Sequence, residues 1–133
     1  DIYKDHDIDF DREAELRDII TSSFNYIKDN FIEVFENCKI QSYNFYSLMG
    51  ALIYNKYGIP DTKGDLADLQ SINQFTINVD HSRDELIRIF TEVDEKNEAG
   101  IFPDFVKASL ATTHSYKNRL TRIKILIAAL QKP

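Results

Sequence analysis

The chain has 133 residues, of which 43% are apolar and 29% are charged, and its formal net charge is −6. This length suits one globular domain with a buried core, and the composition excludes a disordered chain. The single cysteine, Cys38, excludes an intrachain disulfide and a cysteine-rich zinc module. No apolar run reaches the length of a membrane span and the N-terminus does not resemble a signal peptide, so we expect a soluble, cytoplasmic protein with no membrane partner.

Residues 1–11 are predicted to be a polar lead-in, and residues 12–133 an α-helical domain. Alternating aspartates from Asp5 to Asp11 resemble the oxygen ligands of a hard cation. The glycine that turns such a loop and the glutamate that closes it are missing, so no metal site is predicted. The segment from Tyr3 to Asp9 also resembles part of an acidic epitope tag. Residues 1–11 are therefore left out of the functional argument.

From Arg12 onward, apolar residues recur at steps of three and four, which predicts an amphipathic helix as far as Phe35. The apolar stripe consists of Leu16, Ile19, Ile20, Phe24, Ile27, Phe31, Val34 and Phe35. The segment Asn37–Lys39 is expected to break this helix. A second helix is predicted from Ser42 to Tyr57, and Gly58 and Pro60 are expected to end it.

The second predicted helix is rich in tyrosine. Its tyrosines are Tyr43, Tyr46, Tyr54 and Tyr57. They form either an exposed aromatic contact surface or the rim of the core, with their hydroxyls in water. Phe45, Tyr46 and Tyr54 are the candidate partner-binding residues, as the walls of an aromatic groove for a partner helix.

The segment between residues 60 and 80 has the weakest pattern. Leu66–Phe75 is predicted as a short helix, and Thr76–Val79 as an extended segment. Ser82 and Glu85 then form a capping box, in which each side chain bonds a free N–H at the start of a helix. The next helix is therefore predicted to start at Ser82.

Two further helices are predicted towards the C-terminal end. Pro103 fits the first position of a short helix that reaches Thr112, because this position needs no backbone N–H. Ser115 is a good N-cap for the last helix. Together these elements predict a single all-α domain of five or six helices.

The sequence contains no converging set of catalytic groups. His6, His81 and His114 have no second histidine at metal-ligand spacing, and the neighbours Asp80–Ser82 cannot form a hydrogen-bonded relay. Cys38 lacks the local signature of a nucleophile and is expected to be a small buried hydrophobe. The four glycines lie far apart, so no phosphate-binding loop is predicted. We therefore expect that this domain is not an enzyme and that it uses no metal or cofactor.

Charge is distributed unevenly along the chain. All 22 acidic residues lie at or before Asp104, whereas residues 105–133 carry six basic residues and no acidic one. One interpretation is an anionic partner for the basic end. The other is that basic side chains suit the end of a terminal helix and face the acidic body of the same domain.

The C-terminal half resembles a known family. The residues that carry the resemblance are Asp104–Ser109, Ala111–Thr113, Asn118–Ile123 and Leu126–Leu130, and upstream Phe31–Phe35 and Phe45–Ile53. They resemble the helical region of GmrSD-type proteins, which are modification-dependent restriction and phage-defence factors. The resemblance implies a non-catalytic helical domain of a bacterial defence protein, which contacts DNA or its own nuclease or NTPase partner.

Two hallmarks of that family are absent from this sequence: the Asp-Gly-Gln-Gln-Arg motif of its N-terminal part and its His-Asn-His nuclease module. No catalytic residue is therefore carried over, and the resemblance implies that the chemistry belongs to a larger parent protein. The alternative hypothesis is an independent helical module for protein–protein interaction.

The candidate nucleic-acid-binding residues are Lys117, Arg119, Arg122 and Lys124. Arg119 and Arg122 are three residues apart on one predicted helix, so they are expected to point the same way. With the two lysines they would hold a DNA backbone without reading its sequence. The alternative role for the two arginines is to pair with acidic residues of the first helix.

Overall fold

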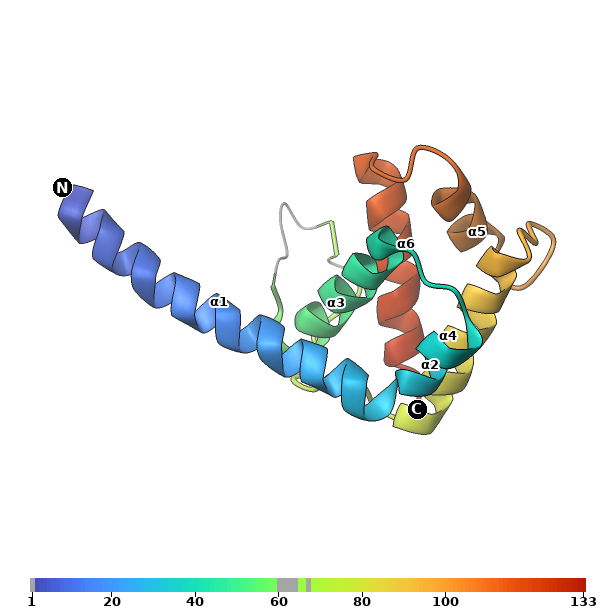
Figure 1. Ribbon diagram of the computed structural model, residues 1–133, viewed down its shortest axis with the longest axis horizontal. Helices are drawn as coiled ribbons and strands as arrows, with labels where there is room; N and C mark the ends of the chain where they lie inside the picture. Colours follow the sequence, from blue (N-terminus) through green and yellow to red (C-terminus); the bar gives the residue numbers. More distant parts are fainter. Residues whose placement is uncertain (1, 60–64, 67) are drawn as a thin grey trace.

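The computed structural model describes residues 2–59, 65, 66 and 68–133, with side chains from Arg12 onward. Within this part of the chain every regular element is a helix, which confirms the predicted all-α fold (Figure 1). The helices are α1 (Ile2–Asn30), α2 (Ile32–Asn37), α3 (Ser42–Tyr57), α4 (Val79–Asp94), α5 (Pro103–Leu110) and α6 (Tyr116–Leu130).

Helices α3 and α6 pack against each other at the centre of the fold (Figure 1). Helix α5 packs on α6, α4 contacts α2, α5 and α6, and α1 contacts α2 and α3. The largest apolar side chains that are fully buried are Phe31, Phe90, Phe105, Leu48, Leu52, Leu86, Ile89, Leu126, Ile127 and Leu130. Their removal from water is the main favourable contribution to folding.

Several predicted helix boundaries are confirmed. Helix α3 has the predicted bounds and ends at Gly58, whose φ of 76° is the left-handed conformation that glycine adopts without strain. Pro103 occupies the first turn of α5. The Ser115 hydroxyl accepts a hydrogen bond from the N–H of Asn118 at the start of α6. Pro60, the other predicted end signal of the second helix, lies outside the described residues.

The N-terminal part of α1 extends beyond the other helices (Figure 1). The backbone is already helical from Ile2, so the helix begins earlier than the predicted start at Arg12. Residues 12–18 are all exposed. Of the predicted apolar stripe, Leu16, Ile20 and Phe24 are 49–51% exposed, whereas Ile19 and Ile27 are buried, so the stripe is only partly covered along α1.

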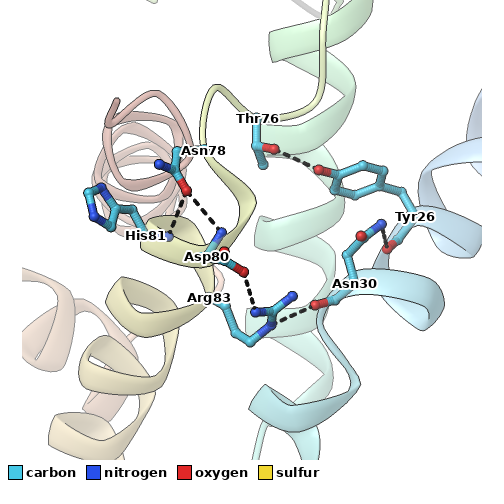
Figure 2. Close-up of polar contacts among 7 residues, drawn as sticks. All are labelled: Tyr26, Asn30, Thr76, Asn78, Asp80, His81 and Arg83. Atoms are coloured by element: carbon cyan, nitrogen blue, oxygen red, sulfur yellow. Dashed lines mark hydrogen bonds and ion pairs between the residues drawn. The ribbon is translucent and has the colours of Figure 1, made fainter.

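The predicted continuation of the first helix to Phe35 is wrong, because the helix breaks at Phe31. This residue has a φ of −120°, its side chain is fully buried, and α2 begins directly after it. Figure 2 shows how the end of α1 is held: the Arg83 Nε–H donates to the Asn30 carbonyl oxygen at 2.9 Å. A cation at this position also interacts favourably with the negative end of the helix dipole.

The capping box predicted at Ser82 does not form. Helix α4 begins three residues earlier, at Val79, and the Asn78 Oδ1 accepts hydrogen bonds from the backbone N–H groups of residues 80 and 81 at 3.1 and 3.2 Å (Figure 2). Ser82 is fully buried, and its hydroxyl lies 3.3 Å from the Ala129 carbonyl oxygen of α6. The Ser82 hydroxyl therefore bonds a neighbouring helix and not the start of its own.

The described residues between Leu66 and Asn78 form turns, bends and irregular backbone, so the predicted helix Leu66–Phe75 is wrong. Of the predicted extended segment Thr76–Val79, Asn78 is extended and Val79 already belongs to α4. The buried Asn55 holds the segment after Leu66: its carbonyl accepts from the Ile72 N–H at 2.9 Å, and its Nδ2 donates to the Phe75 carbonyl at 3.2 Å. Such side-chain bonds to the backbone compete with the hydrogen bonds of a helix. The hydroxyl of Thr76 is hydrogen-bonded to that of Tyr26 at 2.6 Å (Figure 2).

Candidate functional site

Two apolar hollows share the rings of Phe24 and Phe45: one lies between α1 and α3, and the other lies among α1, α2 and α3. Those two rings meet edge to face, with centroids 6.1 Å apart. The larger hollow, of about 490 Å³, is lined by Ile20, Thr21, Phe24, Phe45, Tyr46, Met49, Gly50 and Ile53. The smaller one, of about 210 Å³, is lined by Phe24, Ile27, Lys28, Ile32, Phe35 and Phe45. We refer to the two hollows together as the α1–α3 groove.

Large apolar side chains of the groove face solvent. The exposed fraction is 70% for Tyr46, 51% for Ile20 and 50% for Ile32. The Phe45 ring contacts both Tyr46 and Phe35, with centroids 5.8 and 6.1 Å away. A contiguous apolar surface of this kind is a common mark of a contact site, whereas single exposed apolar residues are not.

The structure brings together two of the three predicted partner-binding residues. Phe45 and Tyr46 line the groove, but Tyr54 does not. Tyr54 is 4% exposed, and its hydroxyl donates to the carbonyl oxygens of Leu66 and Leu69. Eight helical positions separate Tyr46 from Tyr54, which rotates the second ring by about 80° around α3, away from the groove. Tyr54 is therefore a core residue that anchors the segment after α3.

The predicted nucleic-acid-binding residues differ in accessibility. Lys117 and Arg119 are exposed and Lys124 is half-buried, but Arg122 is 1% exposed. Arg122 is therefore not on the surface, and the prediction that it contacts DNA beside Arg119 is wrong. Among the described residues it has no carboxylate within ion-pair distance, so the alternative pairing with acids of the first helix is not found either.

The guanidinium of Arg122 connects three elements of the fold. Its Nη1 donates to the Ala108 carbonyl oxygen in α5 at 2.7 Å, and its Nη2 to the Thr113 carbonyl oxygen at 3.0 Å. Its Nε donates to the Ser47 hydroxyl of α3 at 3.3 Å, and its Cζ lies 5.2 Å from the centroid of the Tyr43 ring. Arg122 thus supplies hydrogen-bond donors to carbonyls near the end of α5, where backbone acceptors are otherwise left free.

A sequence signal for this burial does exist. Arg122 lies four residues before Leu126 and eight before Leu130, so it occupies the apolar face of α6. A lone arginine on such a face indicates a buried guanidinium as readily as a surface contact.

A third hollow, of about 390 Å³, lies where Arg122 meets α3. It is lined by Ser42, Tyr43, Tyr46, Ser47, Thr113, His114, Arg119, Arg122 and Ile123, and we call it the Arg122 pocket. Burial lowers the pKa of Arg122 from its ordinary value, the Tyr43 hydroxyl raises it, and the positive charge of Arg119 lowers it. Two arginines therefore contribute to one pocket whose lining contains no carboxylate.

The groups considered for catalysis do not come together. His81 and His114 are exposed and lie in different parts of the chain. Cys38 is 5% exposed, and burial raises the pKa of its thiol, which is the opposite of what a nucleophile needs. The prediction that Cys38 is a small buried hydrophobe is confirmed. No group of three His, Cys, Asp or Glu residues suited to a metal ion occurs in the part of the chain that the structure describes.

The chain matches none of the family models, curated proteins or solved structures with which it was compared. The resemblance to GmrSD-type proteins therefore stays a prediction from sequence. Among the helices that the structure describes, none is long and apolar enough to cross a membrane.

Proposed function

We propose that this domain is a protein-interaction module that binds an amphipathic helix of another protein in the α1–α3 groove. The observation that carries the proposal is the half-exposed apolar face of α1, formed by Ile20 and Phe24, beside the exposed ring of Tyr46 on α3. These side chains would leave water if a third helix lay along the groove.

The shape of the groove favours a helix as the occupant. Its two hollows are neighbours that share the Phe24 and Phe45 rings, so we expect each to receive an apolar side chain from a successive turn of one partner helix. Tyrosine and phenylalanine supply large contact areas at a small cost in conformational entropy, and such rings are common at the energetic centres of interfaces.

The charged side chains around the groove indicate the charge that a partner helix should carry. Lys28 lines the smaller hollow, and Arg119 and His114 line the pocket that shares Tyr46 with the larger one. Among the residues that the structure describes, none that lines the groove carries a carboxylate. A partner helix with apolar anchors and acidic flanking residues would complement this arrangement.

The proposal is tested with a fluorescent amphipathic peptide that carries leucine at positions i, i+4 and i+7 and glutamate on its flanks. We expect it to bind, and Tyr46→Ala or Phe24→Ala to weaken binding by at least about tenfold, because each removes a ring from the groove. Tyr116→Ala is the matched control, since Tyr116 is 53% exposed and does not line the groove.

Equal binding of the peptide to the wild type and to the Tyr46→Ala variant would contradict the proposal. So would a wild-type chain that is already a dimer through this face and takes up no peptide, because the occupant would then be a second copy. Sedimentation of the wild type and of Phe24→Ala distinguishes the dimer from a monomer with a free groove.

One observation favours a second candidate function, the DNA contact that the resemblance to defence proteins implies. Lys107, Lys117 and Arg119 are exposed on α5 and α6, in the part of the chain without acidic residues. We expect plain or base-modified duplex DNA to bind with a steep dependence on salt, and the Lys117→Glu/Arg119→Glu double variant to lose binding. No binding at low salt would exclude this function.

A further inference from the structure

The Arg122 pocket holds a buried positive charge that no described acidic group neutralises. Only three of the five N–H groups of the Arg122 guanidinium have partners, and these partners are two carbonyl oxygens and one hydroxyl, all neutral. A charge taken out of water is unfavourable unless it is paired. Arg122 lines the pocket, so an anion that enters it would meet a positive charge with no described counter-ion.

Arg119 adds a second guanidinium to the same lining. It lies one turn of α6 before Arg122, it is exposed, and it contributes to the wall of the pocket. An anion placed between two arginines interacts favourably with both and reduces their mutual repulsion. We propose that the Arg122 pocket binds the phosphate group of a small organic phosphate, as a site distinct from the helix-docking groove.

The chemistry of the lining favours a phosphate over a carboxylate. A carboxylate offers two oxygens, whereas a phosphate monoester offers three charged or partly charged oxygens and up to two negative charges. The pocket provides two guanidinium groups, the hydroxyls of Ser42 and Thr113, and the ring of His114. This number of donors matches the larger and more highly charged group.

The size of the pocket indicates that the phosphate is attached to an organic group. A volume of about 390 Å³ is larger than a single phosphate ion needs. The rest of the lining is formed by Ser47 and by the aromatic and apolar residues Tyr43, Tyr46 and Ile123. A flat ring attached to the phosphate would contact these aromatic and apolar surfaces.

The loop that contributes Thr113 and His114 to the pocket is held by hydrogen bonds next to them. The Asn118 Nδ2 donates to the carbonyl oxygens of Ala111 and Thr112, both at 3.1 Å, and to the Thr112 hydroxyl at 2.8 Å. The next residue, Thr113, accepts the hydrogen bond from Arg122. Such a pre-formed loop reduces the entropy lost on binding.

The test is an NMR titration of the ¹⁵N-labelled chain with phenyl phosphate, inorganic phosphate, phenylacetate and benzyl alcohol. Phenyl phosphate is expected to shift the amide signals of Thr113, His114 and Arg119 and to bind more tightly than the other three. Arg119→Ala should weaken its binding by about tenfold. Lys117→Ala, an exposed cation on the same helix outside the pocket, should change it by less than about twofold.

Each contrary outcome overturns the inference in a different way. Equal affinity for benzyl alcohol would mean that the pocket recognises only the ring. Equal losses in Arg119→Ala and Lys117→Ala would mean that the charge of the whole helix attracts the anion. Arg119 also lies beside the α1–α3 groove, because the pocket shares Tyr46 with it, so Phe24→Ala separates the two sites: Phe24 lines the groove and not the pocket, and its loss should weaken peptide binding and leave phenyl phosphate binding unchanged.

Discussion

Replacement of Arg122 by methionine is the most informative single perturbation of this fold. The variant loses three hydrogen bonds from the guanidinium, to Ala108, Thr113 and Ser47, and the contact with the Tyr43 ring. Hydrogen bonds from a charged donor contribute about 1.5 kcal/mol or more each, and the cation–π contact about 1 kcal/mol. Methionine retains part of the packing. It also removes the desolvation cost of the buried charge, which offsets about 2 kcal/mol of the loss.

The net expectation for Arg122→Met is a loss of about 3 kcal/mol in the free energy of unfolding, which is a large fraction of the total for a domain of this size. Urea unfolding followed by the helical circular dichroism signal measures it. Arg119→Met is the control, since it makes the same substitution one turn earlier at an exposed position and should change stability by less than about 0.5 kcal/mol. An Arg122→Met variant as stable as the wild type, or more stable, would refute the reasoning.

Three further predictions concern other parts of the fold. Gly100→Ala should cost about 2 kcal/mol, because its Cβ would clash with the Glu92 Oε1 that accepts from the Phe102 N–H. Gly50→Ala, whose Cβ has its nearest neighbour at 3.6 Å, should show no such loss in thermal unfolding. Asn78→Ala should cost about 1 kcal/mol in urea unfolding, because two N–H groups at the start of α4 lose their acceptor. Alkylation of Cys38 with iodoacetamide should be slow near neutral pH and become fast in urea, because burial raises the pKa of the thiol; a rate like that of a free thiol in the native state would contradict this.

The same raised pKa of Cys38 predicts how stability depends on pH. The unfolded chain loses the thiol proton at a lower pH than the folded chain does. The contribution of Cys38 to the free energy of unfolding should therefore fall as the pH rises above the unfolded pKa of about 8.5. Cys38→Ala should remove this part of the pH dependence in unfolding measured across that range, and an unchanged dependence would exclude Cys38 as its source.

Local signals in the sequence determined most helices of this fold. The bounds of α3, the proline in the first turn of α5 and the serine cap of α6 all follow from residues within one turn of the boundary. Each of these signals acts through backbone groups of the same segment: a glycine that adopts a positive φ, a proline that needs no N–H, and a hydroxyl that accepts one. Such interactions need no other part of the chain.

Tertiary contacts decided what local patterns left open. Helix α1 breaks at Phe31, where the ring is buried and Arg83, more than 50 residues later, bonds the last carbonyl of the helix. Periodicity alone predicted a continuous helix there, because the apolar spacing does not change at the break. The segment after α3 is held by Asn55 and Tyr54, whose partners lie 12 to 20 residues away or further.

At the candidate sites, too, some features follow from the local sequence and others depend on tertiary contacts. The sequence predicted Phe45, Tyr46 and Tyr54 as groove residues and Arg119 and Arg122 as neighbouring surface cations. The structure leaves Phe45 and Tyr46 at the groove and Arg119 exposed, but it buries Tyr54 and Arg122. The sequence did not determine that the α1 stripe is half exposed or that Arg122 is buried. Those facts depend on which helix covers which face, and a side chain becomes buried only when a distant segment packs over it.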